Sequence, residues 1–187
     1  MPSPRIVVEL PDWVDPFINW RRTYAPGEER MDLVVALGRE QVRRGTGGPF
    51  AAAVFERDSG ALVAVGVNLA VPRHNSALHA EVVALMMAEA RLHSHSLGAA
   101  GLAAHELVSS CEPCAMCLGA TCWSGVRRLV TGATRADAEA IGYDEGPVFP
   151  ESYAYLEARG IDVVRGVRRE AARELFTAYQ AAGGEIY

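Results

Sequence analysis

Two short segments carry metal-binding side chains that the fold has to bring together. They are Leu78-His79-Ala80-Glu81-Val82 and Cys111-Glu112-Pro113-Cys114-Ala115-Met116-Cys117. A catalytic zinc takes three protein ligands, often imidazole nitrogen and thiolate sulfur, and keeps a fourth position open for water. His79, Cys114 and Cys117 supply that count. The two distant segments are therefore expected to lie against each other around one zinc ion.

Both segments are predicted to lie at helix N-termini. Pro113 suits the first helical position, because the N–H that it lacks is unpaired at a helix start in any case. Cys114 and Cys117 then sit three residues apart and face the same side. On an ideal helix, residues two apart point roughly 200° away from each other, so His79 and Glu81 converge only where their helix begins. We therefore expect two helix N-termini to meet at the metal.

Glu81 is not needed as a zinc ligand, because His79, Cys114 and Cys117 already supply three. A carboxylate beside a catalytic metal is typical of a general acid and base. The overlapping C-x-x-C pairs are also compatible with a thioredoxin-like redox site or with a three-cysteine structural zinc site. A structural zinc site would leave Glu81 without a role. Cys111 precedes the helix, and Cys122 lies roughly 140° round it from Cys117, so both are expected to be small buried side chains.

Composition and charge restrict the class of protein. A chain of 187 residues with 50% hydrophobic residues suits one globular domain with a sizeable core. The net charge is −5 and no run of basic residues exceeds two, which argues against a nucleic-acid partner. The N-terminus lacks a secretory pattern, and no apolar stretch approaches the roughly 18 residues of a membrane span. We expect a cytoplasmic protein with no membrane partner.

The order of the elements indicates the fold class. Residues 1–30 contain five prolines and are predicted to form an irregular arm, docked by Trp13, Phe17, Trp20 and Tyr24. Hydrophobic spacing and turn residues predict helices near 31–44, 80–92, 113–123, 137–142 and 168–182, and strands near 51–55, 61–67, 106–109, 126–131 and 161–164. Strands that alternate with helices indicate an α/β fold, with a mixed or parallel sheet and helices on both faces.

With these motifs the sequence resembles the cytidine deaminase superfamily, and within it the bacterial guanine deaminases. The superfamily resemblance rests on L-H-A-E-V and C-E-P-C-A-M-C and covers about residues 30–132. The narrower resemblance rests on G-G-P-F-A-A-A-V at 47–54, G-V-N at 66–68, C-L-G-A-T-C-W-S-G-V at 117–126 and I-G-Y-D-E-G-P at 141–147. It extends over nearly the whole chain to members that also accept the triazine ammeline.

This resemblance implies a three-layer cytidine deaminase-like fold, with a central five-stranded mixed sheet between helices. It also implies one zinc ion per subunit and a homodimer. Residues 31–187 are expected to form a single deaminase domain, and about 143–187 a lid that is often exchanged between subunits. The substrate contacts that it implies are Asn68, Ala80, Trp123 and Tyr187, and it implies Glu145 as a second catalytic acidic group, which could also relay a proton to ammonia. Among these, Asn68 is expected to hydrogen-bond the base and Trp123 to contact its face or edge. Tyr143 stands where Phe is common.

The leading hypothesis is therefore hydrolytic deamination of guanine to xanthine and ammonia, with ammeline as a further substrate. Glu81 would shuttle protons, and Glu145 would accept hydrogen bonds from the N1–H and amine donors of guanine. Without the resemblance, Glu145 fits a solvated loop carboxylate better. Three alternatives remain: deamination of a nucleoside such as guanosine or cytidine, editing of adenosine in RNA, and a non-catalytic zinc-stabilised binding scaffold.

Overall fold

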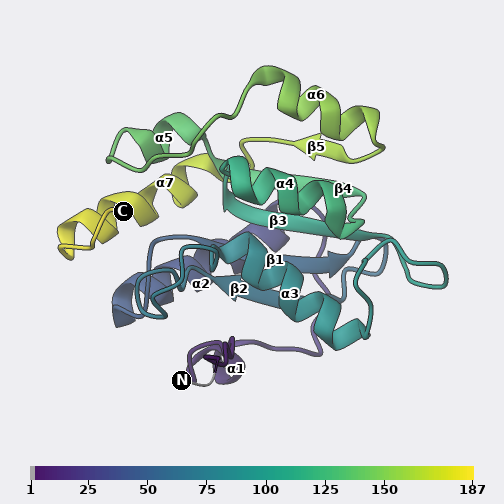
Figure 1. Ribbon diagram of the computed structural model, residues 1–187, viewed down its shortest axis with the longest axis horizontal. Helices are drawn as coiled ribbons and strands as arrows, with labels where there is room; N and C mark the ends of the chain where they lie inside the picture. The colour runs from purple at the N-terminus through teal and green to yellow at the C-terminus, as the bar shows by residue number, and fades with distance from the viewer. Residues whose placement is uncertain (1–2) are drawn as a thin grey trace.

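A computed structural model of the protein describes residues 3–187 and shows helices on both faces of a five-stranded mixed sheet (Figure 1). The strand order is β2-β1-β3-β4-β5, in which β1 pairs antiparallel with β2 and β3, while the β3–β4 and β4–β5 pairs are parallel. The strands are β1 (Ala51–Glu56), β2 (Leu62–Val67), β3 (His105–Cys111), β4 (Arg128–Ala133) and β5 (Asp162–Val164). The predicted three-layer α/β fold is confirmed.

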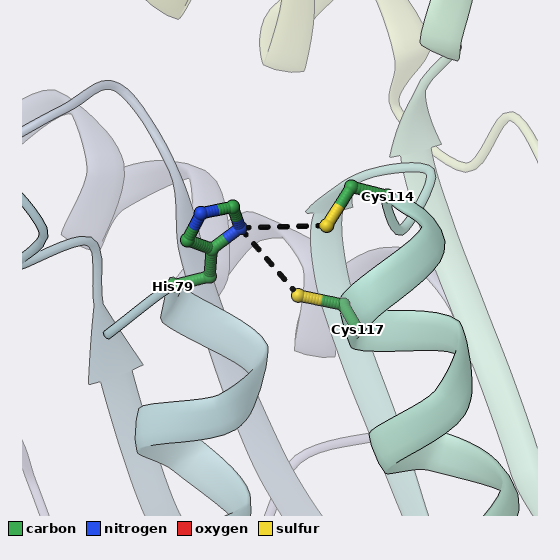
Figure 2. Close-up of side chains that lie close together, drawn as sticks. All are labelled: His79, Cys114 and Cys117. Atoms are coloured by element: carbon green, nitrogen blue, oxygen red, sulfur yellow. Dashed lines mark hydrogen bonds between the residues drawn. The ribbon is translucent and has the colours of Figure 1, made fainter. Parts of the chain in front are cut away.

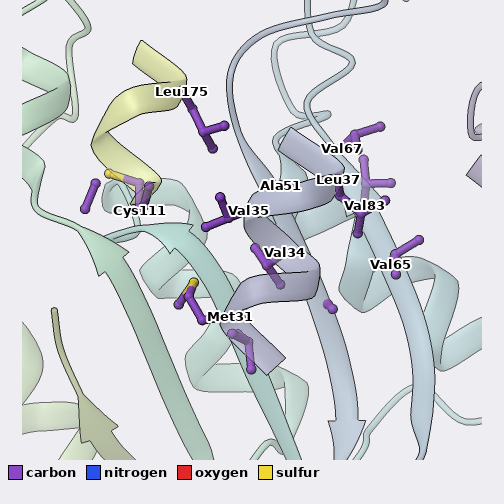
Figure 3. Close-up of a cluster of buried hydrophobic side chains, with 14 of the residues drawn as sticks. Met31, Val34, Val35, Leu37, Ala51, Val65, Val67, Val83, Cys111 and Leu175 are labelled. Carbon is purple, nitrogen blue, oxygen red and sulfur yellow. The ribbon is translucent and has the colours of Figure 1, made fainter. Parts of the chain in front are cut away.

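The helices divide between the two faces of the sheet. The helices are α1 (Val14–Phe17), α2 (Glu28–Arg44), α3 (Ala80–Leu92), α4 (Ala115–Ser124), α5 (Arg135–Glu139), α6 (Pro150–Ala158) and α7 (Arg169–Ala181). Side chains alternate along β1, so Ala53 and Phe55 join the core under α2 and α7, while Ala52 and Val54 join the core under α3 and α4. Figure 3 shows the first core, where residues of α2 and Leu175 of α7 meet side chains of the strands.

Local chemistry explains where two helices differ from the predicted ranges. Helix α2 begins at Glu28, earlier than expected, and ends as predicted before Gly45, which adopts the left-handed conformation that closes a helix. Helix α5 begins at Arg135 and not near Asp137, because Thr134 and Asp137 form a reciprocal capping box. The Thr134 side chain accepts from the Asp137 backbone N–H, and the Asp137 carboxylate accepts from the Thr134 N–H at 2.8 Å.

A fully buried ion pair links α2 to β3. The guanidinium of Arg30 and the carboxylate of Glu106 lie 2.7 Å apart, and both side chains are 1% exposed. Their alignment departs from that of a hydrogen bond, so the pair is held by charge. Arg30 also donates to the backbone oxygens of Tyr24 and Arg57, each at 3.0 Å. This one side chain therefore joins α2, the N-terminal arm and the β1–β2 connection.

Gly66 sets the distance between α3 and the sheet. A Cβ atom on Gly66 would lie 2.1 Å from the Ala80 carbonyl oxygen and 2.4 Å from the Ala84 backbone nitrogen. Only glycine permits this approach of strand to helix. As a result, the first turn of α3, with Glu81 on it, sits directly on β2.

The N-terminal arm packs on the domain. Val14, Ile18 and Tyr24 are buried in the same core as α2, whereas Phe17, an expected anchor, is 40% exposed. The arm also contains the short helix α1, which the proline-rich sequence did not predict. A boundary near residue 30 between an arm and one domain stays a prediction. Among the described residues, no helix is long and apolar enough to cross a membrane.

Candidate active site

Two helix starts meet at the site, as expected. His79 is the N-cap residue of α3, and Cys114 is the N-cap residue of α4. Pro113 therefore lies outside α4, and its predicted place as the first helical residue is wrong. The extended backbone of Cys114 (φ −65°, ψ 172°) places this residue just ahead of the helix, and its carbonyl oxygen accepts the first helical bond from Leu118 at 2.9 Å.

The side chains of His79, Cys114 and Cys117 converge as a metal site requires (Figure 2). Nδ1 of His79 lies 3.4 Å from Sγ of Cys114 and 3.7 Å from Sγ of Cys117. Ligands of a tetrahedral zinc with ordinary Zn–N and Zn–S bonds lie roughly 3.5 Å apart. The observed separations and the donor set thus fit zinc, with three protein ligands and room for a fourth.

The electrostatics of this cluster also suit a metal. A hydrogen bond from Cys117, together with one from His79, lowers the pKa of Cys114 to about 4. Hydrogen bonding to the Cys114 sulfur, followed by burial, raises the pKa of Cys117. The low pKa of Cys114 suits a zinc ligand, because zinc binds the thiolate form of cysteine, and Cys117 would give up its proton when the metal binds.

Glu81 lies beside the cluster without belonging to it. It is 6% exposed, its Oε1 accepts a hydrogen bond from the Ser109 hydroxyl at 3.1 Å, and its Oε2 lies 3.4 Å from Sγ of Cys117. Burial, followed by the negative charge of Cys114, raises the pKa of this carboxyl group. A carboxyl group with a raised pKa next to a metal site is suited to both taking up and releasing a proton near neutral pH.

The cluster opens into a cavity of about 100 Å³. The residues that line it are Phe50, Asn68, His79, Glu81, Glu112, Cys114, Tyr143, Asp144, Glu145 and Tyr187. The cavity thus brings together the expected substrate contacts Asn68 and Tyr187 with the expected catalytic residue Glu145. Ala80 is fully buried behind the lining, and Trp123 is 79% exposed on α4, away from the cavity.

Glu145 reaches the cavity from the loop between α5 and α6. Its carbonyl oxygen accepts a hydrogen bond from the backbone N–H of Ala115 at 3.0 Å, which fixes the loop to the first turn of α4. The side chain is buried, and burial, followed by the charges of Glu81 and Cys114, raises its pKa to about 8. Glu145 is therefore a second carboxyl group of the site and not a solvated loop residue.

An aromatic wall closes the other side of the cavity, and two of its members, Phe50 and Tyr143, were not assigned from the sequence. The ring of Tyr143 meets Phe50 at 4.9 Å and Tyr187 at 5.6 Å between centroids, both edge to face. Tyr187 in turn lies 6.3 Å from the His79 ring. Phe50 and Tyr143 sit within two of the motifs that carry the family resemblance, and this was the available signal. Glu112 and Asp144, which also line the cavity, lie within the motifs C-E-P-C-A-M-C and I-G-Y-D-E-G-P and had the same signal.

Comparison with known proteins decides the family. Residues 26–133, more than half of the chain, match the model of the cytidine and deoxycytidylate deaminase zinc-binding region. The chain belongs to this family. The predicted superfamily is thereby confirmed, and the deaminase presents His79, Cys114 and Cys117 as its candidate zinc site. It is a zinc-dependent hydrolytic deaminase.

Several individual proteins within the comparisons are similar to this chain over much of its length. The deaminase is 36% identical to guanine deaminase of Bacillus subtilis over 134 residues, which is 72% of this chain and 81% of that protein. A solved guanine deaminase of Nitrosomonas europaea is 49% identical, with a TM-score of 0.90, over 97% of this chain and 99% of that one. A structure solved with 2,6-diaminopurine is 51% identical, with a TM-score of 0.91, over 97% and 95% of the two chains. A tRNA-specific adenosine deaminase of Haemophilus influenzae is 32% identical over 90 residues, covering 48% and 49% of the two chains.

Proposed function

We propose that the protein deaminates guanine to xanthine and ammonia. The observation that carries the proposal is the second buried carboxyl group, Glu145, in a small cavity beside the metal cluster and Glu81. Guanine presents two adjacent donors, N1–H and the exocyclic amine, and such a pair requires an acceptor in the pocket. The similarity to guanine deaminases supports the same substrate.

The mechanism divides between the metal site and Glu81. When bound to His79, Cys114 and Cys117, zinc would supply a hydroxide nucleophile at neutral pH, since it lowers the pKa of a coordinated water towards roughly 7. Glu81 accepts the proton of that water, passes a proton to the ring nitrogen of guanine and later to the departing amine. A C–O bond forms at the carbon that carries the amine, the C–N bond breaks, and ammonia leaves. Ser109 holds one oxygen of Glu81, which keeps the other near the metal site.

The remaining lining residues orient the base. Asn68 lies buried at the end of β2, where its backbone oxygen accepts from the Gln41 side chain at 2.8 Å. This contact holds Asn68 in place for a hydrogen bond to the base. Glu145 accepts from the N1–H and amine of guanine, and these donors stabilise its charged form. Phe50, Tyr143 and Tyr187 supply the aromatic surface for a planar ring.

The size of the cavity favours a free base over a nucleoside. Its volume of about 100 Å³ is smaller than the roughly 300–1,000 Å³ of sites for drug-sized ligands. We infer that Tyr187, which lines the cavity, is its outer wall and stands in the way of a ribose attached to the base. The triazine ammeline, which is planar and carries similar donors, is proposed as a further substrate.

The experiment that tests this function measures ammonia release by the zinc-loaded protein with guanine, guanosine, ammeline, adenine, cytosine and cytidine in parallel. We expect release from guanine and none from guanosine or cytidine. If ammonia were released from a nucleoside but not from guanine, the zinc chemistry would stand, but the proposal that the cavity excludes a ribose would be wrong. If none of the six compounds released ammonia although one zinc was bound per subunit, a non-catalytic binding scaffold would be favoured.

Substitution of Glu145 tests base recognition. We expect Glu145→Gln to lower kcat/KM for guanine by about 10- to 100-fold, because the loss of a hydrogen bond to a charged group costs about 1.5–3 kcal/mol. Glu139→Gln is the matched control, since Glu139 carries an exposed carboxylate on α5 and pairs with Arg135 at 3.2 Å. Equal kcat/KM values for the two variants, both fully zinc-loaded, would return Glu145 to the role of a plain loop residue.

Editing of adenosine in RNA has some relatives in its favour, such as the tRNA-specific adenosine deaminase of Haemophilus influenzae. The net charge of −5 argues against it, because RNA binding relies on Lys and Arg that neutralise phosphates. Affinity for single-stranded RNA that falls steeply with salt concentration would revive this function. We assign the protein to small-molecule metabolism in the cytoplasm.

We also propose that the enzyme is a homodimer. Large apolar side chains are exposed on or beside α4 and α6, namely Met116, Trp123, Phe149 and Tyr155. A partner subunit would cover this surface, and Trp123 would then gain a neighbour that the single chain does not provide. Light scattering that gives the mass of one chain at micromolar concentration would contradict the dimer. Since Tyr187 lines the cavity of its own chain, the dimer does not require exchange of the C-terminal segment, and exchange stays a prediction.

A further inference from the structure

The C-terminal tail, residues 182–187, runs from the end of α7 to the cavity. Its last residue, Tyr187, lines the cavity between Tyr143 and His79. Ile186 packs beside Gly142, since a Cβ on that glycine would lie 3.5 Å from Cγ2 of Ile186. The wall of the site thus depends on a short terminal segment with no secondary structure. Such a segment needs an anchor to stay closed.

The anchor begins in the backbone at the end of α7. Gly183 adopts the left-handed conformation (φ +70°), which turns the chain back over the helix. The N–H of Gly184 then donates to the carbonyl oxygen of Tyr179 at 3.0 Å, five residues earlier, as in a Schellman motif. This reversal directs the tail towards the cavity and lays it over the side chain of Tyr179.

The side chain of Tyr179 completes the anchor. Its hydroxyl donates a hydrogen bond to the carbonyl oxygen of Glu185 at 2.9 Å, two residues before the terminus. Gly184 rests on the ring so closely that a Cβ there would lie 2.3 Å from Cζ of Tyr179. Tyr179 is itself 8% exposed, so neighbouring side chains restrict how far the ring can move aside. Gly184 does not have a positive φ, so the requirement for glycine at this position is one of space.

We propose that Tyr179 is a positioning residue, which anchors the C-terminal tail through Gly184 and Glu185 so that Tyr187 closes the cavity. Its effect on catalysis rests on the proposed function, in which Tyr187 is the outer wall of a site for a free base. Tyr179 is neither a metal ligand nor a lining residue of the cavity. Its hydroxyl also interacts with that of Tyr143, which does line the cavity. A test of the anchor therefore has to separate an effect through Tyr187 from one through Tyr143.

The first test measures the tail directly, with a zinc-loaded chain of residues 1–187 and no substrate. Carboxypeptidase A removes aromatic C-terminal residues, and mass spectrometry follows the loss of Tyr187. We expect Tyr179→Phe to speed this loss about two- to tenfold, because cleavage follows the population of the undocked tail and one hydrogen bond is lost. Gly184→Ala should have at least as large an effect, since its methyl group collides with the ring. Tyr155→Phe, which removes an exposed hydroxyl on α6, should leave the rate unchanged.

The second test asks whether the anchor acts through Tyr187. Tyr179→Phe should lower kcat/KM for guanine in the full chain, but should have no further effect in a chain that lacks Tyr187. A merely structural role for Tyr179 would lower kcat/KM equally in both chains and would overturn the proposal, as would loss of Tyr187 at the wild-type rate from both anchor variants. Faster loss of Tyr187 without any change in guanine deamination would support the anchor and refute the proposed part of Tyr187 in the site.

Discussion

Glu81→Gln is expected to lower kcat for guanine deamination by about 100- to 10,000-fold, the contribution of a positioned general acid and base. Glutamine keeps the shape of the side chain and can still accept from Ser109, but its amide cannot carry a proton between water, ring nitrogen and amine. The zinc content should stay at one per subunit, because the three ligand atoms come from His79, Cys114 and Cys117. Ammonia release and metal analysis on the same sample check both parts.

The control for this variant lies on the same helix. Glu89→Gln changes a partly buried carboxylate two turns further along α3, which lines no part of the cavity, and should leave kcat unchanged. A zinc-loaded Glu81→Gln enzyme with kcat within a factor of about three of the wild type would refute the role of Glu81. Loss of zinc from this variant would instead mean that Glu81 takes part in holding the metal.

Arg30→Met is expected to lower the free energy of unfolding by about 3–5 kcal/mol, the cost of removing one member of a buried ion pair. The Glu106 carboxylate would stay 1% exposed, with Arg128, at 3.5 Å, as its only remaining cation among the described residues. Two backbone oxygens would also lose their donor. Urea unfolding of the zinc-loaded protein, with the same buffer zinc for each variant, measures the change.

Two further variants make this prediction specific. The double variant Arg30→Met, Glu106→Leu should be more stable than Arg30→Met alone, because it removes the uncompensated charge. Arg39 lies on the same helix as Arg30 and forms an exposed ion pair with Glu174 of α7, so Arg39→Met should cost less than about 1 kcal/mol. If Arg30→Met and Arg39→Met lowered stability equally, the burial of the ion pair would have no energetic weight.

The sequence predicted the layers and the metal ligands well, because both depend on short-range patterns. Two apolar runs at 51–55 and 61–67, joined by a polar turn, identified β1 and β2, and the motif residues identified the two helix starts. Boundaries failed where a single contact decides them. Thr134 and Asp137 moved the start of α5, and the extended conformation of Cys114 moved the start of α4.

The walls of the cavity could not be derived from spacing. Phe50 follows a glycine turn and Tyr143 lies in a loop, and only the tertiary fold brings their rings to 4.9 Å. Arg30 and Glu106 have the composition of solvent-exposed side chains, and nothing local shows that α2 lies across β3 at that point. For Trp123 the family resemblance predicted too much. The motif predicted that this side chain contacts the substrate, but in the single chain it is exposed to solvent.

The use of N-cap residues as metal ligands has a consequence for folding. His79 and Cys114 occupy the positions where Ser, Thr, Asp or Asn normally satisfies the first amides of a helix, and neither makes such a bond within the described part of the chain. Helices α3 and α4 therefore begin without the roughly 1 kcal/mol that a capping side chain contributes to each. A cation that draws both residues together fixes the same two ends. In this enzyme the catalytic metal would thus also stabilise two helix starts that lack a capping side chain. Removal of the metal by a chelator would therefore abolish activity and loosen both helix starts.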